Sequence, residues 1–96
     1  MKLRLDFDPD ALRALEAQLA WLNERSPRAA QRLRAELFDV LDLVTDGLLD
    51  GMRVTLPTGE VTRRLVVQHL LVFYAREPEA VRVVFIHDAR QRPFDR

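Results

Sequence analysis

The stretch from Thr62 to Arg90 constrains the fold more than any other, because its pattern predicts three consecutive β-strands. The middle strand, His69–Ala75, carries apolar side chains on both faces, so we expect it in the centre of a sheet or beneath a layer of helices. Pro78 interrupts the pattern, since proline fixes φ and lacks the amide proton that a strand ladder needs. The β-branched run Ala80–Ile86 predicts a returning strand, and two strands joined this closely pair as an antiparallel hairpin.

Two helices are predicted before these strands, after a first strand at Lys2–Phe7 in which apolar and polar residues alternate. Asp8-Pro9 is a helix start, in which the carboxylate accepts a bond from a free amide of the first turn. Ser26-Pro27 repeats this signal and predicts a second helix that ends at Thr45, so the two helices form an antiparallel hairpin. The apolar ridge of each helix is Leu12, Leu15, Leu19 and Leu22 on the first, and Ala30, Leu33, Leu37, Leu41 and Val44 on the second.

A short strand at Arg53–Leu56 and a turn at Pro57–Gly59 lead into another strand at Val61–Val67. We therefore expect residues 1–96 to form one domain of the α+β class. Its order is an N-terminal strand, an antiparallel helical hairpin and then a three- to four-stranded antiparallel sheet, with the helices on one face.

Composition restricts the function classes. The chain has no cysteine, which excludes disulfides and thiolate zinc sites, and we expect neither a metal nor a cofactor. No apolar run is long enough to span a membrane, and a cytoplasmic location is expected. The formal net charge is zero, which argues against unaided binding to nucleic acid. Residues 1–50 hold seven basic and ten acidic groups and residues 51–96 hold eight and five, so the C-terminal half is positive by three.

The segments, in this order, resemble the toxins of the RelE/ParE superfamily, the small proteins of bacterial type II toxin–antitoxin modules. The resemblance covers nearly the whole chain and is closer to ParE. It rests on the first strand and helix, on ERSPRAAQRL between the helices, on Arg63-Arg64-Leu65-Val66-Val67, on the LVFY of the central strand and on the closing His87-Asp88-Ala89-Arg90.

The resemblance implies a toxin that arrests growth, as in plasmid stabilization, and that is neutralised in a hetero-oligomer with its cognate antitoxin. ParE-like members are described as poisons of DNA gyrase, whereas RelE-like members cleave mRNA in the ribosome. A non-toxic relic or regulatory domain with the same fold is a third interpretation, since fold does not fix function.

A ribonuclease would need a general base, a general acid and cations for the developing phosphorane charge. The resemblance makes Arg63, His87 and Arg90 the candidate catalytic residues for this alternative, although each also suits a structural role. Two departures favour the binding protein over the enzyme. Val84 stands where many members have arginine, and Phe94 stands where active ribonucleases have a proton-transferring side chain.

A protein that acts by binding needs exposed contact surfaces and no catalytic acid or base. Ala14, Ala17 and Trp21 lie on one side of the first helix and are the expected antitoxin-binding residues, with tryptophan as the anchor. The alternative is that Trp21 packs on the second helix. Tyr74, on the central strand, is expected in the core. The expected target-binding residues are Arg63, Arg90, Arg92 and Phe94.

Overall fold

The computed structural model describes residues 2–90, in which two helices follow the first strand and precede four more strands. The elements are β1 (Arg4–Phe7), α1 (Pro9–Arg25), α2 (Pro27–Thr45), β2 (Met52–Thr55), β3 (Val61–Val67), β4 (Leu70–Arg76) and β5 (Ala80–Asp88). The α+β class and the element order are confirmed. The first strand is shorter than predicted, and His69 lies in the β3–β4 turn instead of in the central strand.

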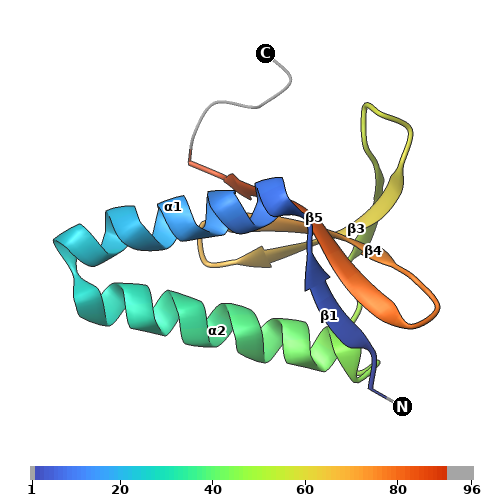
Figure 1. The fold of residues 1–96 in the computed structure, drawn as a ribbon, viewed down its shortest axis with the longest axis horizontal. Coiled ribbons are helices and arrows are strands. Elements are labelled where there is room, and N and C mark those ends of the chain that lie inside the picture. The colour runs from blue at the N-terminus through green and yellow to red at the C-terminus, as the bar shows by residue number, and fades with distance from the viewer. Residues whose placement is uncertain (1, 91–96) are drawn as a thin grey trace.

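The strands form one sheet in the order β1-β5-β4-β3-β2. Strands β2 to β5 are antiparallel, as predicted, whereas β1 pairs with β5 in parallel, with Arg4 opposite Ala80. Strand β5, the last described strand, therefore lies inside the sheet between β1 and β4 (Figure 1). The intervening helical hairpin allows this arrangement, because parallel strands need a long crossover connection.

The helical hairpin turns at a single residue. Ser26 ends α1 and begins α2, and its side-chain oxygen accepts a hydrogen bond from the amide of Ala29 at 3.2 Å. At the other end of α2, Gly47 takes a positive φ of 77°, as expected of a glycine cap. The start of α1 differs from the prediction: the Asp8 side chain makes no capping bond and pairs instead with Arg82, 2.7 Å away.

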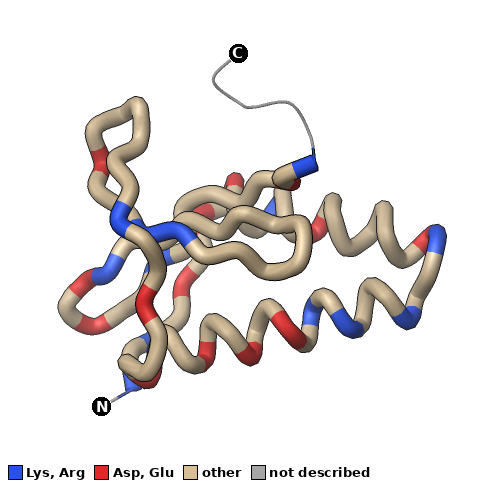
Figure 2. The backbone as a smooth tube through the Cα atoms, turned by 180° about the vertical axis from the view of Figure 1, so that it is seen from behind, with Lys and Arg blue, Asp and Glu red and all other residues tan. Residues whose placement is uncertain are grey.

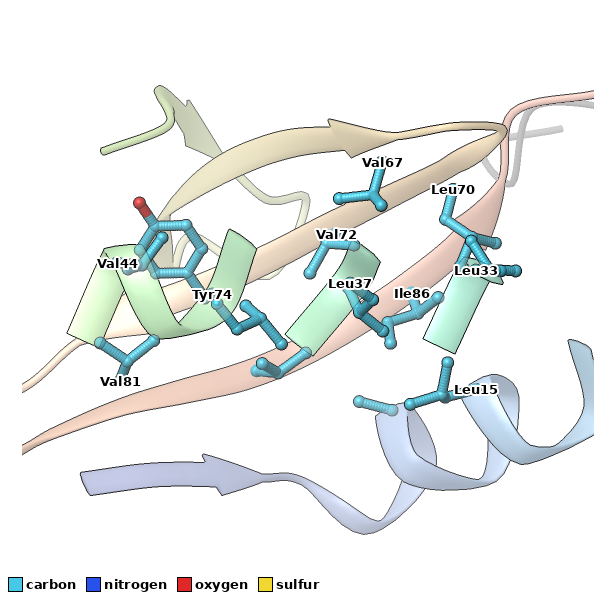
Figure 3. Packing of buried hydrophobic residues seen from close by; sticks show 13 residues of the cluster. Leu15, Leu33, Leu37, Val44, Val67, Leu70, Val72, Tyr74, Val81 and Ile86 are labelled. Atoms are coloured by element: carbon cyan, nitrogen blue, oxygen red, sulfur yellow. The ribbon is translucent and has the colours of Figure 1, made fainter. Parts of the chain in front are cut away.

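The core lies between the helices and one face of the sheet. Side chains of α2 and of the three central strands meet there, joined by Leu15 of α1 (Figure 3). All five residues of the predicted α2 ridge are buried. The predicted α1 ridge is partly wrong, because Leu12 is 42% exposed and Ala11 takes the buried position. Helix α1 contacts the sheet chiefly through β5, so its inward stripe is narrow.

A β-bulge in β5 changes which residues face the helices. Phe73 of β4 lies opposite Phe85, but the next residue, Tyr74, lies opposite Val83, which leaves Val84 as the extra residue. Beyond this bulge the inward positions are Ile86 and Asp88. Without it, alternation from Val83 would point Asp88 to the other face.

No helix in residues 2–90 is long and apolar enough to cross a membrane.

Candidate functional site

A pocket of about 310 Å³ opens where the middle of α1 meets the end of β5. We call it the Trp21 pocket, after the residue that is 47% exposed at its wall. Its lining comes from two segments far apart in the sequence: Ala17, Gln18, Trp21, Asp88 and Arg90. The structure thus brings together two of the predicted antitoxin-binding residues and one of the predicted target-binding residues. Ala14 is partly buried and packs against the core.

Two arginines flank the Trp21 ring. The Arg25 guanidinium lies 3.8 Å from the ring centroid and donates a hydrogen bond to the Trp21 carbonyl at 2.9 Å. The Arg90 guanidinium lies 5.9 Å from the same centroid. Both distances are within the range of cation–π attraction, so the Trp21 ring interacts with two positive charges. Nearly half of Trp21 remains exposed, so the ring is open to a partner whatever its buried half contacts.

Asp88 fixes the position of Arg90. The residue is 6% exposed, and its carboxylate accepts hydrogen bonds from the Arg90 amide at 2.9 Å and from Arg90 Nε and Nη2 at 3.1 Å each. These bonds lower the pKa of Asp88 despite its burial. His69 lies nearby on the β3–β4 turn, where burial and then the charge of Arg90 lower its pKa. The Arg90 guanidinium is therefore a fixed cation, held by a buried carboxylate at all but acidic pH.

Arg63, on β3, belongs to a second cluster that includes the loop between α2 and β2. Its Nε lies 3.2 Å from Asp50 Oδ2 and its Nη1 donates to the Gly51 carbonyl at 3.1 Å. Arg76 reaches the same carboxylate at 3.8 Å. We call Asp50, Gly51, Arg63, Tyr74 and Arg76 the Arg63 cluster. With two guanidinium groups and one carboxylate, it carries an excess positive charge, and the Arg63 side chain is 38% exposed.

Tyr74 ties this cluster to the core. Its ring is fully buried, as predicted, and its hydroxyl donates to Asp50 and accepts a bond from the Gly51 amide at 2.7 Å. Burial, followed by the bond to Asp50, raises its pKa to about 12. The phenol therefore stays protonated at neutral pH, which suits an anchor for the loop better than a proton carrier.

The three residues predicted for a ribonuclease lie at different places in the fold. Arg63 pairs with Tyr74 and shares its helix-facing side, because directly opposed residues point the same way. His87 pairs with Leu71 on the other side, where its ring stacks on Phe85 with centroids 6.1 Å apart. Arg90 lies at the Trp21 pocket. The remaining predicted site residues, Arg92 and Phe94, fall outside the described part of the chain.

Sequence reasoning missed Arg82, which holds three carboxylates together. Its guanidinium lies 2.7 Å from Asp8, 2.7 Å from Glu60 and 2.9 Å from Glu77. The bond to Glu77 contributes most to raising the pKa of Arg82. These partners come from the start of α1 and from two turns, so the ion-pair cluster joins three distant segments.

No group of three or more histidine, cysteine, aspartate or glutamate side chains is placed to hold a metal ion within residues 2–90.

Comparison with known proteins gives one informative match. The family model described as "ParE toxin of type II toxin-antitoxin system, parDE" matches residues 5–93, which include the Trp21 pocket and the Arg63 cluster. A search of curated proteins finds no match.

Proposed function

Because the chain belongs to the ParE toxin family of type II toxin–antitoxin systems, we propose that it acts by binding DNA gyrase and that its antitoxin neutralises it at the Trp21 pocket. The family implies an antitoxin partner. The resemblance to ParE-like toxins supplies the target. Binding is favoured over catalysis because Arg63, His87 and Arg90 lie apart. In a ribonuclease, the acid, the base and the phosphate contact would have to converge on the phosphodiester bond that is cleaved.

The Trp21 pocket suits an apolar side chain flanked by carboxylates. Tryptophan and arginine are the residues that most often dominate binding energy, and here an exposed indole lies between two guanidinium groups. Asp88 holds Arg90 in place before any partner arrives, so little side-chain entropy is lost on binding. We place the antitoxin anchor here, with Arg25 and Arg90 contacting its acidic groups.

Replacing Trp21 by alanine is expected to weaken antitoxin binding by about tenfold to a hundredfold, since a half-exposed ring contributes more to an interface than to the fold. Isothermal titration of the purified toxin with the antitoxin encoded beside it measures this change. Leu48→Ala is the matched control, because Leu48 is also an exposed large apolar residue but lies on the loop after α2. Equal affinities for the wild type and Trp21→Ala would rule out this anchor.

The target surface is tested by the double variant Arg63→Ala, Arg90→Ala. We expect at least about a tenfold loss of killing on induction, because each guanidinium is partly exposed and available to acidic groups of a partner. Arg64→Ala is the control, since Arg64 is the neighbour of Arg63 on the opposite face of β3. Circular dichroism checks that both variants fold. Full toxicity of the folded double variant would show that the proposed target surface is wrong.

The ribonuclease remains the second candidate, favoured by the positive Arg63 cluster, whose exposed guanidinium suits a phosphate. Induced expression separates the candidates when gyrase-dependent DNA damage and mRNA decay are both followed. Arrest with damaged DNA and intact messages supports the gyrase poison, and rapid loss of translated messages supports the ribonuclease. Unimpaired growth supports the non-toxic relic.

A further inference from the structure

The charges of α2 are divided into two halves. Its N-terminal half, Pro27–Ala35, holds Arg28, Arg32 and Arg34 and no acidic residue. From residue 36 to residue 46 the chain holds no basic residue and four acidic ones: Glu36, Asp39, Asp42 and Asp46. Figure 2 shows this division along the helix, with the basic positions at the end next to the interhelical turn.

This division does not stabilise α2 itself. A helix is stabilised by acidic residues in its first turn and basic residues in its last turn, and α2 has neither. Within residues 2–90 none of its three arginines forms a salt bridge, while Lys2 lies against Asp42 and Asp46. Arg34 lies 5.5 Å from the centroid of the Phe38 ring. Arg28 and Arg32 are therefore the arginines of α2 that are available to a partner outside the chain.

The exposed side of α2 that carries these charges has a small residue at its middle. Arg28, Gln31, Ala35, Phe38 and Asp42 recur at spacings of three and four and so lie on one stripe. Gln31, Ala35 and Phe38 line a shallow pocket of about 320 Å³, and Gln31 also lines a second pocket of about 300 Å³ between α2 and α1. A helix that crosses at Ala35 can approach closely, because alanine projects only a methyl group.

We propose that this stripe of α2 binds the same stripe of a second copy of the chain, in antiparallel orientation about a two-fold axis at Ala35. Residues whose numbers sum to 70 then face each other. On the stripe itself, Arg28 of each copy meets Asp42 of the other. Such an isologous contact is self-complementary and closes at a dimer.

The charge distribution of α2 favours a second copy of the chain as the partner, in the antiparallel orientation. A parallel copy would place arginine against arginine and carboxylate against carboxylate, whereas the antiparallel copy pairs every charged half with its opposite. The contact lies on α2 alone and uses none of the residues of the Trp21 pocket. It therefore goes beyond the proposed function and does not depend on it.

The first test is the self-association of the full chain, measured by sedimentation velocity from micromolar to about millimolar protein. We expect a monomer–dimer equilibrium whose dissociation constant rises at least about tenfold between roughly 0.05 M and 0.5 M salt, because exposed ion pairs are screened. A chain that stays monomeric at the highest concentration in low salt would overturn the proposal.

Disulfide trapping tests the axis. The chain has no cysteine, so Ala35→Cys introduces one thiol, which meets its own copy at the two-fold axis. Ala17→Cys is the control, an exposed alanine replaced on α1. Under mild oxidation the Ala35→Cys chain should cross-link at least about ten times faster, since a disulfide requires Cα atoms within about 4–7 Å. Equal rates would overturn the proposal.

A mixing experiment tests the pairing. One variant carries Asp42→Arg, and the other carries Arg28→Glu. Each alone should be monomeric, because positions 28 and 42 then carry like charges. The mixture should form a heterodimer in which the arginines of one copy face the carboxylates of the other. Dimers of either variant alone would place the contact on another face and overturn the proposal, as would a mixture that stays monomeric.

Discussion

Replacing Gly51 by alanine is expected to lower the free energy of unfolding by about 3 kcal/mol, at the upper end of the cost of overpacking. A Cβ atom at this position would lie 2.4 Å from the carbonyl oxygen of Arg64 and 2.8 Å from its carbonyl carbon. Both atoms belong to the backbone of β3, so no side-chain rotation relieves the clash. The start of β2 would have to move away from the sheet. The bond that Arg63 donates to the Gly51 carbonyl and the bond that the Gly51 amide donates to the Tyr74 hydroxyl would then be lost.

Gly59→Ala is the control for this prediction. Gly59 has a φ of 93° but open space around its Cβ position, so alanine there costs only the conformational strain, about 1 kcal/mol. Urea denaturation followed by circular dichroism measures both variants. If Gly51→Ala were no less stable than Gly59→Ala, the close approach of β2 to β3 would not be a constraint in solution.

Replacing Arg82 by alanine is expected to cost about 2–3 kcal/mol, since hydrogen bonds to charged groups contribute more than neutral ones. The Arg82 side chain is only 28% exposed, and its removal would leave Asp8, Glu60 and Glu77 facing one another without a cation. Repulsion among the three carboxylates adds to the lost bonds. The start of α1 would lose its ion pair to β5, although the buried contacts of Ala11 and Leu15 would remain.

Arg82→Lys should lose less stability than Arg82→Ala, because lysine keeps the charge but not the planar fork that reaches three partners. The exposed pair of Arg4 and Asp6 provides a second comparison, and Arg4→Ala should change stability by less than about 0.5 kcal/mol. Thermal and urea unfolding of the three variants measure this order. Equal stability of Arg82→Ala and Arg4→Ala would contradict a structural role for the ion-pair cluster.

Local sequence patterns correctly predicted the helices and strands that pack against segments close to them in the sequence. The α2 ridge, the turn at Ser26 and the hairpin of β4 and β5 each follow from residues that are close together in the sequence. Interactions between distant segments escaped the prediction. Asp8 has the composition of a helix cap, yet its side chain pairs with Arg82, 74 residues away, because a charged partner competes with the first-turn amides.

The candidate site was predictable in its members but not in its arrangement. Trp21 and Arg90 were each identified, yet their proximity depends on how α1 crosses β5. Arg25 could have been found from its spacing of four residues from Trp21, which places both on one side of a helix. Asp88 could not, because its burial depends on the bulge at Val84, and alternation alone points it to the other side of the sheet.

The interior position of β5 bears on how the toxin is made. Its neighbours in the sheet are β1 and β4, so β1 has no strand partner until the chain has been synthesised to about residue 88. Synthesis proceeds at about 5–20 residues per second, and for most of that time the nascent chain lacks the strand that completes its core. The pairing of β1 with β5 is therefore a late step of folding, because it closes a long loop of the chain and completes the core.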